Sequence, residues 1–214
     1  MKKTSESKRS QSAARARGNS GAPSRLARTA IAIAVWVAIN PALAQVGPNT
    51  LPTGASVTSG QATVSTAGTR MDINQATPRV SLGWESFSIG SNSSVVFSQP
   101  SASAIALNRV LGNDVSYIFG RLSANGQVFL INPAGVVFSP TARVDVGGIV
   151  ASTLNLTDSD FNAGRYVFNR GAGAGNVVNQ GSIVTSPGGY AALFGSSAVN
   201  EGVIVAKMGS IAVA

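Results

Sequence analysis

Apolar and polar residues alternate in many short runs along this chain, and turn-forming residues separate the runs. Residues 79–89, RVSLGWESFSI, place Val80, Leu82 and Trp84 on one parity, and residues 94–98, SVVFS, repeat the pattern. A period of two is typical of strands with one buried face. The pattern therefore predicts a chain of short strands, with Trp84 in the core.

The densest part of this pattern is residues 123–154, SANGQVFLINPAGVVFSPTARVDVGGIVASTL. Short β-branched and aromatic runs alternate there with Pro- and Gly-containing turns. Three short strands at three corners within one period are typical of one coil of a solenoid. We predict strands at 128–131, 136–138, 144–146 and 149–151, with turns at 132–135, 139–140 and 147–148.

The sequence repeats with a spacing of 21 residues. Gly126 and Gly147 are 21 positions apart, and residues 179–185, NQGSIVT, match residues 200–206, NEGVIVA, at the same spacing. One repeat per coil places equivalent residues about 4.8 Å apart, where stacked Asn amides can hydrogen-bond and Gly can form a tight corner. The predicted repeat ladder consists of Asn179, Gly181, Asn200 and Gly202.

These observations predict an all-β parallel β-helix with about 21 residues per coil and roughly five to seven coils. Residues 45–80 are expected to form an N-terminal β cap, because an open solenoid end exposes core and strand edge; a flexible linker is the alternative. Residues 81–214 are expected to form the helix. Residues 209–214 predict a further strand without a polar cap, so two alternatives stay open: a truncated product, or the start of a longer protein.

Four local features between the strands are also predicted. Residues 157–164, TDSDFNAG, are expected to be a solvated loop, since they do not resemble a calcium-binding EF-hand. Residues 165–169 predict a strand, and residues 171–175 a flexible glycine corner. Asn108 and Arg109 are expected to be exposed.

Residues 1–44 have the features of a secretory signal peptide. They contain eight of the sixteen basic residues and one of the eight acids, and the apolar run AIAIAVWVAI at 30–39 is followed by Pro41 and an A-x-A site. Cleavage is predicted between Ala44 and Gln45. A membrane anchor is the alternative, but ten apolar residues are too few for a stable span. The rest of the chain carries +1, which disfavours nucleic-acid binding.

The chain contains neither Cys nor His. Disulfides, thiol nucleophiles, Ser-His triads and the usual zinc sites are therefore excluded, and no cofactor or metal site is expected. The acids outside the leader are scattered along the sequence, whereas two-carboxylate chemistry needs a close pair. They are Asp72, Glu85, Asp114, Asp145, Asp158, Asp160 and Glu201.

The segments ALNRV (106–110), SYIFGRLSANGQVFLINPAGVVFSP (116–140), VDVGGIVASTLNL (144–156) and the NxGxI copies resemble the N-terminal two-partner secretion domain of filamentous haemagglutinin-type exoproteins. The resemblance spans roughly residues 50–214. It implies a right-handed parallel β-helix, export to the periplasm, and recognition by a dedicated outer-membrane β-barrel transporter. The protein is then expected outside a Gram-negative cell or on its surface.

A four-residue turn carries the recognition hypothesis. The family's motif is usually Asn-Pro-Asn-Gly, whereas this chain has Asn132, Pro133, Ala134 and Gly135. Ala134 removes one side-chain turn hydrogen bond. Two roles stay open: a β-turn that Pro and Gly require sterically, and a turn that the transporter recognises.

Two other functions also stay open. Many β-helices are enzymes that cleave acidic polysaccharides, although no reaction is predicted here because the acids are scattered. Alternatively, the exposed face of the coils binds a host-cell or glycan receptor directly. Tyr117, Tyr166 and Tyr190 are the aromatic candidates for stacking on sugars.

Overall fold

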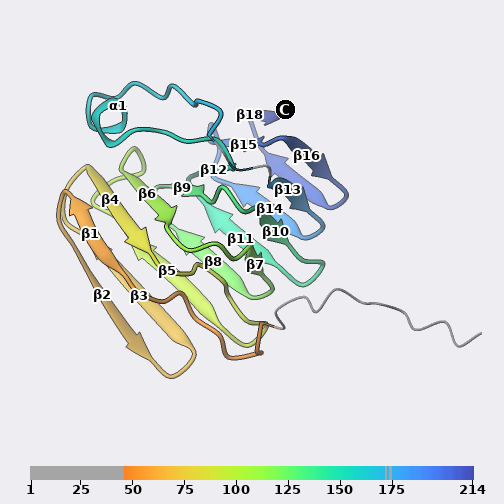
Figure 1. The fold of residues 1–214 in the computed structure, drawn as a ribbon, viewed down its shortest axis with the longest axis horizontal. Coiled ribbons are helices and arrows are strands. Elements are labelled where there is room, and N and C mark those ends of the chain that lie inside the picture. Colours follow the sequence, from red (N-terminus) through yellow and green to blue (C-terminus); the bar gives the residue numbers. More distant parts are fainter. Residues whose placement is uncertain (1–45, 172, 174) are drawn as a thin grey trace, which may run out of the picture. The chain divides into compact units, whose positions relative to one another are not determined.

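The computed structural model describes residues 46–171, 173 and 175–214, and in them the chain forms eighteen strands and one short helix. Figure 1 shows the strands stacked coil upon coil in three sheets. Most neighbouring strands are parallel, so the fold is the predicted all-β parallel β-helix. The predicted signal peptide and the cleavage pair Ala44 and Gln45 lie outside the described residues.

The first sheet has seven strands in the order β1-β4-β6-β9-β12-β15-β18, which places strands from successive coils side by side. All its pairs are parallel except that of β1 with β4. The strands are β1 (Ser56–Ser59), β4 (Arg79–Trp84), β6 (Ile105–Val110), β9 (Gln127–Ile131), β12 (Gly148–Ser152), β15 (Tyr190–Phe194) and β18 (Ser210–Val213).

The other two sheets supply the remaining sides of each coil. The order is β16-β13-β10-β7 in one and β17-β14-β11-β8-β5-β3-β2 in the other. The four-stranded sheet consists of β7 (Ser116–Ile118), β10 (Val136–Phe138), β13 (Asn176–Asn179) and β16 (Ser197–Asn200). The seven-stranded sheet consists of β2 (Ala62–Ala67), β3 (Arg70–Gln75), β5 (Ser94–Ser98), β8 (Arg121–Ala124), β11 (Arg143–Val146), β14 (Ser182–Thr185) and β17 (Val203–Ala206).

The 21-residue period appears directly in the register of three strand pairs. Val128 of β9 pairs with Ile149 of β12, and the same offset relates β13 to β16 and β14 to β17. Longer connections change the offset elsewhere: Ser94 of β5 pairs with Arg121 of β8. The coils therefore share one cross-section, while the loops between strands vary in length.

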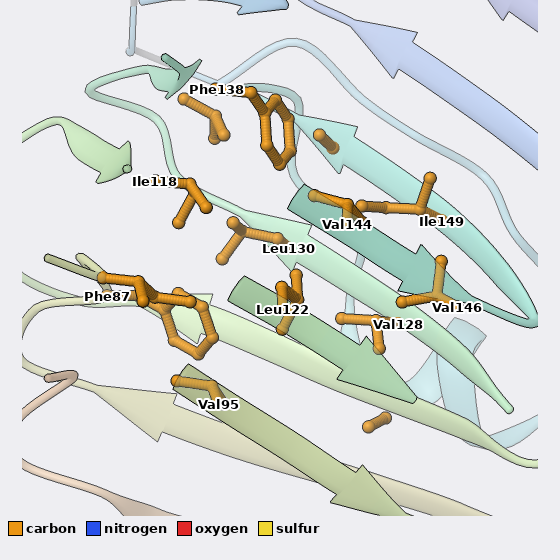
Figure 2. Close-up of a cluster of buried hydrophobic side chains, with 14 of the residues drawn as sticks. Phe87, Val95, Ile118, Leu122, Val128, Leu130, Phe138, Val144, Val146 and Ile149 are labelled. Atoms are coloured by element: carbon orange, nitrogen blue, oxygen red, sulfur yellow. The ribbon is translucent and has the colours of Figure 1, made fainter. Parts of the chain in front are cut away.

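Columns of apolar side chains fill the interior (Figure 2). Val95, Leu122, Val144 and Ile183 occupy equivalent register positions on four successive strands, and none is more than 2% exposed. Burial of each such side chain contributes about 1.5–3 kcal/mol. Trp84 is fully buried as predicted, and its Nε1 donates a hydrogen bond to the Asn108 amide oxygen at 3.0 Å.

A column of glycines lies at the corner that precedes the first sheet. Gly147 donates its backbone N–H to Gly126 O at 2.7 Å, and a Cβ on Gly147 would lie only 2.6 Å from the same oxygen. Added Cβ atoms on Gly189 and Gly209 would likewise overlap the carbonyl oxygens of Gly147 and Gly189. The 21-residue glycine spacing therefore reflects backbone contact between coils that leaves no room for a side chain.

Antiparallel strands cover the N-terminal end of the β-helix. Strand β1 pairs antiparallel with β4, and β2 pairs antiparallel with β3, whereas β3 already pairs in parallel with β5. This end of the stack therefore presents strands of opposite direction, which suits a cap because it interrupts the parallel edge. The boundary of the cap at residue 80 stays a prediction.

Three local predictions are wrong. Asn108 is buried because it faces the interior beside Trp84, and the other two fail because one connection between strands is longer than a simple loop. Asn108 is fully buried, residues 157–164 contain helix α1 (Asp158–Asn162), and residues 165–169 contain only one isolated bridge, between Asn155 and Asn169. The long connection between β12 and β13, which contains α1 and is called the excursion below, folds back over the outer face of the first sheet. Its side chains Leu156 and Phe161 pack there in a second apolar cluster with Ile105, Leu107, Phe129, Ile131, Val150 and Ala192.

Gly189→Ala is expected to destabilise the protein by about 1–3 kcal/mol, because the new methyl group overpacks the backbone of the neighbouring coil. Gly171→Ala is the matched control, since a Cβ there meets no described atom within 4 Å. Denaturant unfolding of both variants measures the difference. Equal stability of the two variants would contradict the backbone-contact explanation.

Candidate functional site

The predicted recognition turn lies between β9 and β10. Gly135 N donates to Asn132 O at 3.0 Å, which closes a four-residue β-turn. Pro133 fixes one φ of this turn, and Gly135 has φ of 130°, a conformation that L side chains rarely adopt. The Pro and Gly of the motif are therefore both required by the backbone.

The Asn132 side chain holds this turn from inside the protein. It is fully buried; its Nδ2 donates to Asp114 O and Ser116 Oγ, both at 2.9 Å, and its Oδ1 accepts from Ala134 N at 2.9 Å. These bonds tie the turn to the strand β7 region of the preceding coil. In the folded protein Asn132 is therefore structural, and its amide offers no surface to a partner.

Pro133 and Ala134 form the half-buried part of the turn, and a glycine-rich segment passes across them. Gly175 N donates to Pro133 O at 3.2 Å, and a Cβ on Gly175 would overlap the backbone of Ala134. Beside the turn lies an open cleft of about 520 Å³ whose wall includes Leu111, which is 65% exposed. An exposed apolar side chain therefore lies beside the turn.

The predicted repeat ladder is brought together by the structure. Asn179 is fully buried, donates from Nδ2 to Asn200 Oδ1 at 2.7 Å, and accepts from Gly181 N at 3.2 Å. The Asn200 amide in turn donates to Gly202 O at 3.4 Å. A Cβ on Gly202 would overlap Gly181 O, so each Asn-x-Gly copy rests directly on the previous one.

Sequence reasoning missed the contact that fastens the excursion to the first sheet. Arg109 Nη1 contacts Asp158 Oδ1 at 2.9 Å, Arg109 Nη2 donates to Leu156 O, and Ser81 Oγ donates to Asp158 Oδ1 at 3.0 Å. In the same excursion, hydrogen bonds from Thr157 and Arg165 lower the pKa of Asp160. Strands β6 (IALNRV) and β9 (QVFLI) carry apolar residues on both faces. This pattern could have predicted that another segment of the chain covers the outer face of the first sheet.

Three of the acids outside the predicted signal peptide form ion pairs. Asp72, Asp158 and Asp160 each pair with a different arginine. Within the described residues, no group of three or more His, Cys, Asp or Glu side chains is placed to hold a metal ion. No helix in that part of the chain is long and apolar enough to span a membrane.

The three tyrosines mostly pack against neighbouring side chains. Tyr117 stacks on Phe119, and the Tyr190 hydroxyl donates to Gln127 Oε1 at 2.6 Å, while burial raises the pKa of Tyr190. Tyr166 is 40% exposed and contacts the edge of Phe129. Of the three, Tyr166 therefore presents the most open ring.

Comparison with known proteins decides the family. The model of the TPS secretion domain, the two-partner secretion domain, matches residues 49–214. The chain belongs to this family. The match covers every strand of the described structure, and it confirms the resemblance on which the sequence analysis relied.

Curated and solved relatives agree with this assignment. Two heme/hemopexin-binding proteins of Haemophilus influenzae are 40% identical over 160 residues (72% of this chain) and 38% identical over 116 residues (54%). The chain spans only 18% and 12% of their lengths. The HMW1 secretion domain of H. influenzae superposes with a TM-score of 0.69 at 33% identity, covering 72% of this chain and 41% of that one. Residues 49–214 of this chain are therefore a two-partner secretion domain.

Asn132→Ala is expected to cost about 3 kcal/mol of stability and Asn179→Ala about 2 kcal/mol, because each leaves buried polar partners unpaired. Asn113→Ala, an exposed control in the neighbouring loop, is expected to change stability by less than about 0.5 kcal/mol. Chemical denaturation of the three variants tests this. If Asn132→Ala unfolded like Asn113→Ala, the structural role of the buried amide would be disproved.

Proposed function

We propose that this domain directs its own chain across the outer membrane of a Gram-negative cell, through a dedicated β-barrel transporter that recognises it in the periplasm. The observation that carries the proposal is the family match over residues 49–214. The predicted signal peptide, residues 1–44, would bring the chain to the periplasm, and the folded domain would stand outside the cell or on its surface. No reaction is assigned to it.

Recognition is proposed to occur before the chain folds. An unfolded strand of this sequence has free backbone N–H and C=O groups that can add to the edge of a sheet in a partner, by β-augmentation. The described strands are only three to six residues long. The chain has no cysteine, so no disulfide would block its passage through a pore while extended.

The burial of Asn132 in the turn is consistent with recognition before folding. The Asn132 amide is enclosed in the folded protein, so a partner can contact it only in the unfolded chain. Ala134 contributes its backbone N–H to the turn, and this contact does not depend on its side chain. We therefore propose that Asn132–Gly135 serve the transporter while unfolded and close the coil after export.

Folding outside the cell is proposed to make export directional. Each new coil pairs its strands with the coil already formed, so the chain outside gains hydrogen bonds and buries apolar side chains as it emerges. A folded coil is too wide to return through a pore that passes an extended chain. Folding would thereby bias movement outward.

Secretion of the full chain is expected to require the transporter. The chain is expressed in a Gram-negative host with and without the cognate transporter, and the medium is assayed. Protein should appear outside only when the transporter is present. A folded chain retained in the periplasm in both cases would overturn the proposal.

Asn132→Ala is expected to reduce secretion more than Asn179→Ala does. Both changes remove a buried Asn amide, but only the first lies in the proposed recognition turn. Secreted protein is compared with the unfolding free energy of each variant. A loss of secretion that follows stability alone in both variants would remove the recognition role.

Val146→Asp is expected to slow export without preventing recognition. Val146 is 1% exposed in the interior, and a carboxylate there costs several kcal/mol. The control Val184→Asp changes an outward-facing, 38% exposed residue of the same sheet. The rate at which each variant appears in the medium is measured, and equal rates would argue against folding as the driving step.

A further inference from the structure

A small open cleft lies at the corner where β5, β8 and β11 begin, away from the recognition turn. Its volume is about 390 Å³. It combines two guanidinium groups with several hydroxyl and amide side chains. The lining residues that matter here are Ser91, Asn92, Ser93, Arg121, Thr141 and Arg143.

The two arginines occupy equivalent positions on adjacent coils. Arg121 of β8 and Arg143 of β11 are register partners, so their backbones lie about 4.8 Å apart. Like charges directly opposite each other on neighbouring strands repel. Arg143 is held in place because its Nη1 donates to Ala142 O at 2.9 Å and to Pro140 O at 3.3 Å. The register thus places two positively charged residues on neighbouring strands at one cleft.

Neither arginine has a carboxylate partner among the described residues, whereas three other arginines do. Arg70, on the same sheet, forms an ion pair with Asp72 at 2.6 Å. The acid that follows on β11, Asp145, lies two residues beyond Arg143 and lines a separate groove with Val96 and Ser123. The charge at the cleft is therefore not neutralised by the fold.

A buried hydroxyl at the same cleft also lacks a partner. Ser93 is 3% exposed, and its Oγ makes no hydrogen bond within the described part of the chain. A buried hydroxyl without a partner costs about 1–3 kcal/mol. Two other polar groups of the lining are already bonded within the protein: Thr141 Oγ1 donates to Phe119 O at 2.8 Å, and Asn92 Nδ2 donates to Asn49 Oδ1 at 3.1 Å. An acceptor oxygen bound in the cleft would accept the hydrogen bond that the Ser93 hydroxyl does not make within the protein.

We infer that Arg121 and Arg143 form a subsite for one oxyanion group, a sulfate or phosphate, that is supplied either by the free ion or by an acidic sugar. Guanidinium groups bind such oxygens through paired, charge-assisted hydrogen bonds. The bound anion replaces the repulsion between the two arginines with attraction to both. The subsite belongs to the folded domain and is independent of how the chain is exported.

The test uses the purified full chain. Sodium sulfate is titrated against sodium chloride at equal ionic strength, and binding is followed by calorimetry. A sulfated disaccharide and its unsulfated counterpart are titrated in the same way. Arg121→Gln and Arg143→Gln are compared with Arg170→Gln, which removes the same charge from an exposed site elsewhere.

Sulfate is expected to bind saturably to the wild type and to Arg170→Gln, and about tenfold more weakly to the two cleft variants. Tighter binding of the sulfated disaccharide than of free sulfate assigns the sugar as the source, and equal binding assigns the free ion. Without ligand, Arg121→Gln should melt no lower than the wild type, since a repulsion is removed. Absence of saturable binding, or an equal loss in Arg170→Gln, would overturn the subsite.

Discussion

The parallel hydrogen-bonded ladder between successive coils is the constraint on which this structure depends. It fixes the distance between coils at about 4.8 Å, and at that distance backbones meet at the corners. Gly126, Gly147, Gly189 and Gly209 follow from this, because a Cβ at each later position would strike the carbonyl oxygen of the glycine before it. The same spacing stacks Asn179 on Asn200 and aligns the apolar columns of the interior.

The ladder also explains which side chains act and where. Residues at equivalent positions are repeated along the axis, so a polar residue in one coil forms a row with its equivalents in the next. The stacked amides of Asn179 and Asn200 are one such row, and the two arginines at the start of β8 and β11 are another. A carboxylate two positions along a strand faces the same side but a different groove, as Asp145 does. Position within the coil therefore determines whether a polar side chain is structural or available.

The sequence alone predicts the parts that repeat and misses the part that does not. Strands, turns and the 21-residue spacing follow from alternation and from the Asn-x-Gly copies, since identical residues must stack in identical places. The excursion with α1 occurs once, and its helix of five residues is too short to show a helical period. Its anchor joins Arg109 to Asp158, 49 positions apart, and spacing in the sequence does not predict such a pair.

The two candidate sites can act at different stages of export, because one is buried in the folded protein and the other forms only on folding. Asn132 is enclosed once its coil closes, so its amide can meet a partner only in the extended chain and afterwards serves the fold. Arg121 and Arg143 are far apart in an unfolded chain and come together only when β8 and β11 pair. A site built across two coils is therefore absent during transport and appears on the exported, folded protein. One sequence can in this way present different chemistry on the two sides of a membrane without any moving part.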